Sequence, residues 1–502
     1  MKSIQEELQM KRFLLVLSLL MVIFTISISI IGQESTTQIP LDHPYAAFLE
    51  SRAFGASLGA TAEFNKMEWV VLDEANSKYY ITMSDITGAM TDGEGEISVD
   101  ENRCGIVYAG DLDAEYNLSE LRPLVVGGPF TDGAENPCDV NNISNPDGLA
   151  IDARGRLWIA EDTGRHVNNM LWVYDPADGS LKRFGYVPVG AEVTGVYISD
   201  AGHLFFSNQH PDGTNTAPYN RGNVIVVTGF NANTDDFEAI EVPTGDAQTV
   251  VGVAAGEIQV LATSGDAIPA NDSQVVGGIY TVAGELMFES DNPDGIMWLP
   301  TNEEESEGTL FVNYEGIPGG VMELSLSYSE MAWTVNGGSM VDFSSVYGTW
   351  INCGSAVTPW NTGLTSEEYE PFAGDLANVE MMTEYLGGTQ ANPYDYGWVV
   401  ELMPSDMGTT VTKHYAMGRY SHENSWVAPD GKTVYFGDDG ANVMFFKFVA
   451  DVEGDLSAGT LYAAKVTQSG GMGNDHVLTF EWIELGRASN DEIAASIREM
   501  EF

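Results

Sequence analysis

The chain has 502 residues, of which 44% are hydrophobic, so it can bury a large core. Its 74 acidic residues against 21 basic ones give a formal net charge of −53. Such a charge repels nucleic acid and anionic lipid and excludes nucleic acid as an expected partner. It suits calcium binding or a salty habitat, although solvation is the simpler role for most of the carboxylates.

The first residues indicate export. The basic segment Met10-Lys11-Arg12 precedes an apolar run from Phe13 to about Gly32, a pattern typical of a signal peptide or a membrane anchor. The run is long for a signal and nearly long enough to span a bilayer, so both interpretations stay open. We assign residues 1–35 to this segment and residues 36–502 to a single domain, secreted, periplasmic or on the extracellular surface.

Helical periodicity is confined to Leu41 to Ser57 and to the tail from Asn490 to Phe502. Elsewhere, runs rich in Val, Ile, Tyr, Phe and Trp alternate with Gly, Asn, Asp and Pro clusters, which indicates strands. One pattern recurs: an apolar strand, a turn with Asp or Gly, an aromatic strand and a final acidic or amide group. In chain order these hairpins span residues 69–85, 148–162, 196–208, 296–315 and 426–439.

These hairpins predict an all-β chain forming a single β-propeller of about six blades, with long loop insertions and short peripheral helices. A large β-sandwich or two packed β domains are the alternatives. In a propeller, loops from different blades meet at one mouth of the channel, so the terminal acidic groups can converge there. Metal ions would supply the counter-charge. For any single carboxylate, capping a turn is the simpler role.

The three cysteines, Cys104, Cys138 and Cys353, are too few for a disulfide scaffold. An exported chain could pair the first two and leave Cys353 as the odd thiol. Residues 352–368 place that cysteine before a Thr-Pro-Trp turn and the pair Glu367-Glu368. A thiolate among carboxylates suggests a transition metal, whereas a cysteine taken alone is more simply structural.

Together these motifs resemble the PhoX family of exported alkaline phosphatases. The family block N-C-A-G-G-x-T-P-W-G-T-W-L-T-C-E-E matches Asn352-Cys353, Thr358-Pro359-Trp360, Thr362, Leu364-Thr365 and Glu367-Glu368 at the same spacing. Further family segments are similar to Asn392–Glu401, Gly418–Glu423, Gly437–Asp439, Asn145–Asp152, Glu192–Gly195 and Gln209–Pro211.

The resemblance implies hydrolysis of phosphomonoesters by a metal-bridging oxygen nucleophile, with Ca²⁺ and Fe³⁺ as cofactors. It implies that Cys353 binds iron as a thiolate and that Glu368, rather than Glu367, shares an iron and calcium cluster with Glu423 and Glu68. Asp147 is a further candidate ligand. Additional candidates are Asp162, Asp438 and Asp439 for structural calcium, His422 as a side chain that orients a ligand, and Glu315, which resembles the glutamate of the family's V-N-H-E segment.

For catalysis and for substrate binding, the resemblance points to Lys66, which stands where the family has an arginine that grips phosphate. Lysine supplies charge but not a bidentate fork, so we expect looser orientation of the phosphate. Gly148 also replaces a family asparagine. Arg419 is a second substrate-binding candidate, although a structural ion pair is its simpler role.

The order of the motifs differs from that of the family, because Lys66 to Trp69 and Pro146-Asp147 here precede Cys353. We therefore predict a circular permutation, which a closed ring tolerates. The site residues Glu68, Asp147, Cys353, Glu368 and Glu423 should then converge at one channel mouth.

The sequence is thus interpreted as an exported, monomeric phosphatase that acts on small phosphomonoesters for phosphate acquisition. Its only expected membrane contact is through the N-terminal segment. Two alternatives stay open: a calcium-binding propeller that serves as a surface or binding protein without catalysis, and a phosphodiesterase or lactonase on the same fold.

Overall fold

The structure, a computed structural model, describes residues 39–405 and 407–500. The apolar run from Phe13 to Gly32 lies outside these residues. Within the described ranges, no helix is long and apolar enough to cross a membrane.

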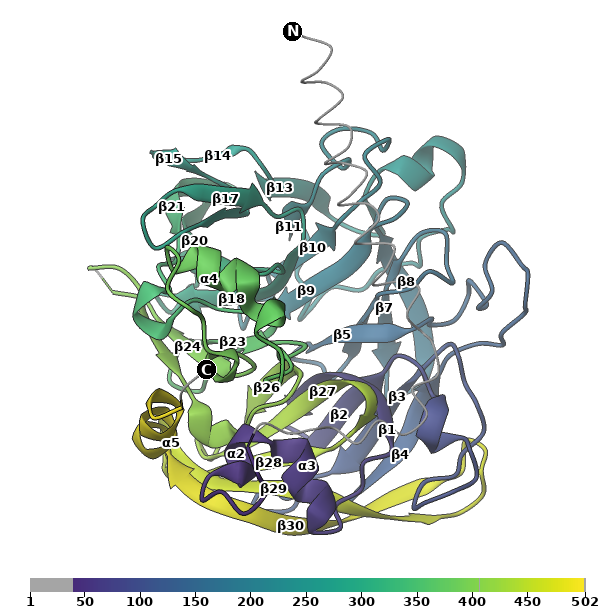
Figure 1. Cartoon of the computed structure of the whole chain (residues 1–502). Coiled ribbons are helices and arrows are strands. Elements are labelled where there is room, and N and C mark those ends of the chain that lie inside the picture. The colour runs from purple at the N-terminus through teal and green to yellow at the C-terminus, as the bar shows by residue number, and fades with distance from the viewer. Residues whose placement is uncertain (1–38, 406, 501–502) are drawn as a thin grey trace, which may run out of the picture. The chain divides into compact units, whose positions relative to one another are not determined.

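The strands form six successive antiparallel blades, coloured in chain order in Figure 1. Each blade is a meander in which sequence neighbours pair. The first blade consists of β1 (Phe64–Asp73), β2 (Lys78–Met83), β3 (Ile106–Asp111) and β4 (Glu120–Val126), and the second of β5 (Pro146–Ile151), β6 (Leu157–Glu161), β7 (Met170–Asp175) and β8 (Ser180–Tyr186). The third consists of β9 (Glu192–Ile198), β10 (Leu204–Gln209), β11 (Asn223–Thr228) and β13 (Glu257–Thr263), and the fourth of β18 (Pro293–Pro300), β19 (Glu307–Tyr314), β20 (Gly320–Ser329) and β21 (Ala332–Met340). The fifth consists of β22 (Asn352–Val357), β23 (Gly363–Glu367), β24 (Val399–Met403) and β25 (Thr410–Lys413), and the sixth of β26 (His422–Val427), β27 (Thr433–Val443), β28 (Phe446–Val452), β29 (Asp455–Ser469) and β30 (Val477–Ser489).

The first strand of every blade lies on the inside of the ring. Each inner strand contacts the next one: β1 contacts β5, β5 contacts β9, β9 contacts β18, β18 contacts β22, β22 contacts β26, and β26 contacts β1. The ring is therefore closed, and the predicted six-bladed propeller is confirmed. The five predicted hairpins are the inner strand pairs of five blades, and the sixth pair is β22 and β23, which carries Cys353.

The first and last blades are joined more closely than the others. The end of β27 pairs with β1, and β30 pairs with β4, which closes an eight-stranded barrel-like sheet. Its interior has its own hydrophobic core, which includes Phe64, Tyr79, Tyr435 and Phe445. This closure fixes the two ends of the ring against each other without a further strand.

Aromatic side chains fill the spaces between blades. Trp158 in the second blade is fully buried, with its ring centroid 6.3 Å from that of Phe230, which follows β11 in the third blade, and Trp298 in the fourth blade packs 6.1 Å from Phe205 in the third. Burying a side chain of this size stabilises the fold by about 2–3 kcal/mol. The inner strands are thereby held rigidly, which keeps the groups at their ends in place.

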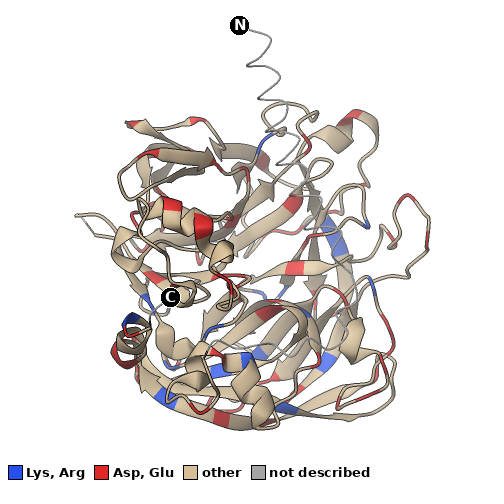
Figure 2. Cartoon of the chain, in the orientation of Figure 1, with Lys and Arg blue, Asp and Glu red and all other residues tan. Residues whose placement is uncertain are grey.

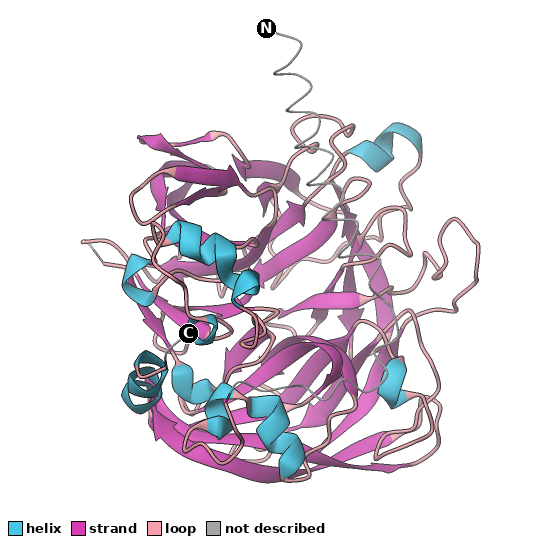
Figure 3. Cartoon of the chain, in the orientation of Figure 1, coloured by secondary structure: helices cyan, strands magenta, loops and turns pink. Residues whose placement is uncertain are grey.

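Helices are short and peripheral (Figure 3), as predicted. The two predicted helical regions contain α2 (Ala46–Leu49) with α3 (Ser51–Ser57), and α5 (Asn490–Arg498). A capping box of Ser489 and Glu492 begins α5. A further short helix, α4 (Glu380–Tyr385), was not predicted. The remaining strands are β12 (Gly252–Val253) and two hairpins, β14 (Ala267–Ile268) with β15 (Asn271–Val275) and β16 (Gly278–Tyr280) with β17 (Leu286–Glu289). The 3₁₀ turns are η1 (Gly88–Met90), η2 (Gly245–Thr249), η3 (Ser344–Val346), η4 (Leu376–Val379), η5 (Pro393–Asp395) and η6 (Tyr415–Met417).

The cysteine pairing follows the prediction. Cys104 and Cys138 form a disulfide. Cys353 is free and buried, which leaves its thiol available to the site described next.

Candidate metal centre

The inner strands share a β-bulge at the same place in their pairing with the second strand. In five blades the first of the two residues inside this bulge has an acidic or thiol side chain. A bulge re-aims the side chains that it contains, and here it repeats around the ring. These residues are Glu68 in β1, Asp147 in β5, Asp294 in β18, Cys353 in β22 and Glu423 in β26.

The third blade breaks the pattern with a glycine. Gly195 occupies the corresponding bulge in β9 and has a φ of +59°. A Cβ atom at this position would lie 2.2 Å from the backbone oxygen of Asp294 in the next blade. Glycine therefore lets β9 and β18 approach closely, and the set of acidic and thiol side chains has no member in this bulge of the third blade.

A second set of acidic groups follows the partner strands. The inner-strand residue just before each bulge pairs with a residue of the second strand. In four blades the residue that follows this second-strand partner is a carboxylate: Asp162, Glu315, Glu368 and Asp439. In the first blade this residue is Ser84, whose hydroxyl donates to Glu68 Oε1 at 2.5 Å. The repeated pairing thus supplies two tiers of ligand-type side chains.

The side chains meet in three overlapping groups, within each of which the ligand atoms lie within 4.8 Å of one another. Cys353 belongs to two of these groups, because its Sγ lies 3.0 Å from Asp294 Oδ2 and 3.1 Å from Glu423 Oε1. The groups are Asp294, Glu315 and Cys353; Cys353, Glu368 and Glu423; and Glu68, Asp147 and Glu423.

All five residues expected to converge are therefore brought together. Their metal ligation and the circular permutation stay predictions. Asp294 is the residue that sequence reasoning missed. A signal for it was present, because Asn145-Pro146-Asp147-Gly148 recurs as Asn292-Pro293-Asp294-Gly295.

The electrostatics of the cluster favour cations. Burial and the nearby Asp439 raise the pKa of Glu68 to about 8, and burial with Glu192 raises the pKa of Glu315 to about 7. Burial and neighbouring carboxylates raise the pKa values of Glu423 and the Cys353 thiol well above their usual ranges. Groups of one sign so close together either hold protons or bind a counter-charge.

Basic residues are fewer than acidic ones along the chain (Figure 2), and two of them pair with carboxylates at or beside this cluster. Lys66 pairs with Asp439, and His210 pairs with Glu192. Asp439 Oδ1 is buried without a hydrogen-bond partner among the described residues. Carboxylate oxygens suit a hard cation such as Ca²⁺, and a thiolate favours a softer transition metal, so this donor set fits metal ions.

Lys66 lies at the open edge of the cluster. Its Nζ is 2.7 Å from Asp439 Oδ2, and 37% of its side chain is exposed. Burial lowers the pKa of Lys66 because it disfavours the charged ammonium. The negative charges of Asp439 and Glu68 have the larger effect and raise this pKa above its ordinary value. Lys66 is thus a permanent cation that solvent and small anions can reach.

The structure does not bring Arg419 to the cluster. Its guanidinium donates to the backbone oxygens of Tyr396 at 2.8 Å and Pro393 at 3.2 Å, and also to that of Pro371. It lies over the ring of Tyr394. This arrangement favours a structural role for Arg419. Its partners are backbone carbonyl groups, whereas we expected an ion pair with a carboxylate.

The two adjacent glutamates have different surroundings. Glu367 forms a fully buried ion pair with Lys413 at 2.9 Å and accepts hydrogen bonds from the backbone of Gly397 and Trp398. Its oxygens are already satisfied. Glu368, the next residue, belongs to the cluster, which agrees with the preference for Glu368 as the ligand.

Two other candidates have structural partners. Burial lowers the pKa of His422 to about 3, so the imidazole is neutral, and its Nε2 contacts the backbone oxygen of Gly418 at 2.9 Å. Asp438 Oδ2 accepts a hydrogen bond from Nε of the Arg52 guanidinium at 3.0 Å. Neither belongs to the three ligand groups.

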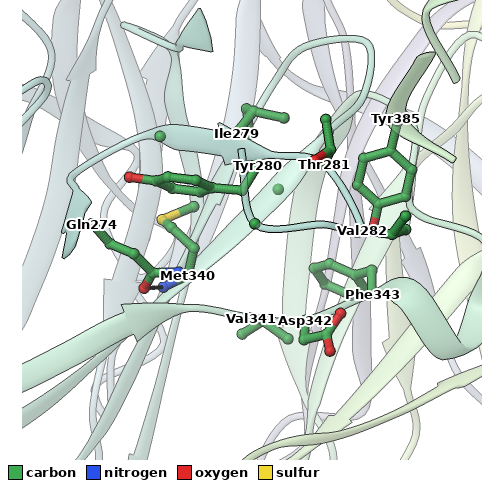
Figure 4. Close-up of a pocket in the computed structure, with 14 residues that line it drawn as sticks. Gln274, Ile279, Tyr280, Thr281, Val282, Met340, Val341, Asp342, Phe343 and Tyr385 are labelled. Atoms are coloured by element: carbon green, nitrogen blue, oxygen red, sulfur yellow. Dashed lines mark hydrogen bonds between the residues drawn. The ribbon is translucent and has the colours of Figure 1, made fainter. Parts of the chain in front are cut away.

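A separate hollow of about 180 Å³ lies beside the fourth blade (Figure 4). Tyr280, Met340, Phe343 and Tyr385 contribute to its lining. It contains no member of the acidic cluster, so the chemistry of this protein is not expected there.

Comparison with known proteins agrees with the motifs. A family model described as "Alkaline phosphatase PhoX" matches residues 36–212 and 329–501. A search of curated proteins finds no match.

Among solved structures, the chain is similar to Pseudomonas fluorescens PhoX in complex with vanadate, a transition state analogue, at 28% identity and a TM-score of 0.30. That match covers 34% of this chain and only 35% of the other. A putative gluconolactonase is 11% identical, with coverage of 85% and 94% and a TM-score of 0.37. A regucalcin from Agrobacterium tumefaciens is 12% identical, with coverage of 75% and 84% and a TM-score of 0.35.

Proposed function

The chain belongs to the PhoX family of alkaline phosphatases, and from this premise we propose that it is an exported, metal-dependent enzyme that hydrolyses phosphomonoesters. The observation that carries the proposal is the convergence of Cys353 with carboxylates from the first, second, fourth, fifth and sixth blades in three overlapping groups. Such a concentration of buried acid is costly unless cations neutralise it.

The donor types suggest how the cations would be shared. Cys353 with Asp294, Glu315, Glu368 and Glu423 would hold Fe³⁺, because a thiolate favours a transition metal. The all-oxygen group of Glu68, Asp147 and Glu423 would hold Ca²⁺. When bound, such ions activate water and neutralise charge on the phosphoryl oxygens.

The chain's own residues would bind and orient the ester. Lys66, exposed at the edge of the cluster and fixed by Asp439, would attract the phosphate and absorb part of the negative charge that develops on it. Arg419 would support the site indirectly by holding the backbone of residues 371, 393 and 396. Export through the N-terminal segment and a monomeric state belong to the same proposal.

Purified protein assayed on p-nitrophenyl phosphate, before and after chelation, tests the function. We expect turnover that disappears with chelation and returns when calcium and iron are restored, together with both metals in elemental analysis. Absence of turnover under every metal condition would contradict the proposal and favour a binding protein. Hydrolysis of a phosphodiester or a lactone in place of the monoester would correct the substrate class.

A further inference from the structure

Lys66 and Tyr369 lie side by side at the edge of the acidic cluster, although 303 positions separate them in sequence. Lys66 Nζ is 3.1 Å from the Tyr369 hydroxyl. The side chain of Lys66 is 37% exposed and Tyr369 is 47% exposed. Glu68 and Glu423 are only 3% and 2% exposed. Lys66 and Tyr369 are therefore more accessible to an ester that arrives from solvent than Glu68 and Glu423, whereas Asp147 and Glu315 are partly exposed.

One carboxylate holds both groups. Asp439 Oδ2 accepts a hydrogen bond from Lys66 Nζ at 2.7 Å and another from the Tyr369 hydroxyl. Asp439 is 2% exposed, so its shared oxygen is a fixed point from which the two donors are positioned. Their separation is set by the fold and not by chance contact between two mobile side chains.

The backbone of Tyr369 is also fixed. Its N–H donates to Ser421 Oγ at 2.9 Å, and its carbonyl accepts from Trp350 Nε1 at 2.9 Å. Tyr369 has a φ of +47°, a conformation that is uncommon for a residue with a side chain. These contacts hold an exposed aromatic residue in a strained conformation directly after the candidate ligand Glu368.

We propose that the Tyr369 hydroxyl and the Lys66 ammonium form a two-donor clamp for the phosphate group. This inference rests on the proposed phosphatase function and assigns its substrate contacts. A single lysine provides charge without a fork, and a hydroxyl 3.1 Å away supplies the second directed donor. The Lys66 ammonium has three N–H donors and can keep Asp439 while it binds phosphate. The Tyr369 hydroxyl rotates from Asp439 to a second phosphate oxygen.

The test uses metal-loaded enzyme and inorganic phosphate as the probe. Phosphate binding is measured by calorimetry and as product inhibition of p-nitrophenyl phosphate turnover. Tyr369→Phe removes the hydroxyl and keeps the ring, so we expect phosphate affinity to fall about tenfold, with a matching rise in KM and a smaller change in kcat. Tyr328→Phe, on the outer part of the fourth blade in β20, is the matched control and should leave both values unchanged.

A rescue variant separates phosphate binding from mere support of Asp439. In Lys66→Arg combined with Tyr369→Phe, the guanidinium supplies two donors by itself, so phosphate affinity should return to within about threefold of the wild type. Unchanged phosphate affinity in Tyr369→Phe, with turnover intact, would refute the clamp and leave the phosphatase function standing. A loss that the double variant does not restore would instead assign Tyr369 to holding Asp439. If the wild type neither binds phosphate nor turns over, the proposed function itself fails.

Discussion

Cys353 Sγ lies 3.1 Å from Glu423 Oε1, and the two residues occupy equivalent bulges of the neighbouring inner strands β22 and β26. The same bulge places Asp294 on the other side of the thiol, at 3.0 Å. One local irregularity, repeated around a closed ring, thus gathers ligand-type groups from blades that are distant in sequence.

Replacement of the thiol should remove a particular metal. Cys353→Ser keeps the size of the side chain but loses the soft donor, so we expect iron to be lost while calcium is largely retained. Turnover should fall by more than about tenfold. Elemental analysis and steady-state kinetics measure both effects. Retention of iron at the wild-type level would refute the thiolate role.

The adjacent glutamates should give opposite phenotypes. Glu367→Gln breaks a fully buried ion pair with Lys413 and should destabilise the fold by about 3 kcal/mol, with metal content per folded molecule preserved. Glu368→Gln should reduce metal content and turnover with a smaller effect on the stability of the metal-free protein. Thermal unfolding and elemental analysis of the two variants, each the control for the other, distinguish these outcomes. Equal metal loss in both would contradict the assignment.

Asp294, found only from the structure, should be as necessary as Glu423. We expect Asp294→Asn to lower metal content and turnover to the extent that Glu423→Gln does, because both carboxylates flank the Cys353 thiol. Asp113→Asn, at an exposed turn, serves as the control and should match the wild type. Full activity in Asp294→Asn would exclude this carboxylate from the metal centre.

The metal-free protein should lose stability as the pH rises. The pKa of Glu68 is raised from 4.5 to about 8 and that of Glu315 from 4.5 to about 7. At pH values between the unfolded pKa of 4.5 and the raised pKa of each group, the folded state binds more protons than the unfolded state. The contribution of Glu68 and Glu315 to the stability of the fold is therefore complete below pH 4.5 and is lost as the pH approaches 8. Bound cations replace those protons.

The difference in Tm between cation-loaded and chelated protein should therefore widen from pH 5 to pH 8. Thermal unfolding in matched buffers measures this difference, and Glu68→Gln should reduce the pH dependence in the chelated protein. A Tm difference that stays constant or narrows with rising pH would contradict the raised carboxylate pKa values.

The glycine in the third blade should not tolerate a side chain. Gly195→Ala places a Cβ atom 2.2 Å from the backbone oxygen of Asp294 at a φ of +59°, so it should lower stability by about 2–3 kcal/mol and also weaken metal binding through Asp294. Gly133→Ala, at a glycine with positive φ and no atom near the added Cβ, isolates the backbone cost. Equal destabilisation by both changes would show that the close approach is unimportant.

The sequence by itself determined the repeating unit, and its resemblance to a family supplied most of the candidate ligands. Strand alternation and turn residues are local properties, so the hairpins at residues 69–85 and 148–162 could be identified from spacing alone. The motifs around Cys353, Glu368 and Glu423 also lie within short stretches. Their chemistry is therefore visible without the fold.

The family resemblance led us to expect five of these groups at one site, but only the tertiary structure decided which other groups join them and which stay apart. Asp294 lies 3.0 Å from Cys353 across 59 positions, and Lys66 meets Asp439 across 373. Arg419 is directed to backbone carbonyls instead of the cluster. Such contacts depend on the closure of the ring and on the bulges that re-aim each strand, and charge interactions depend on distance through space. No local pattern in the chain encodes that distance.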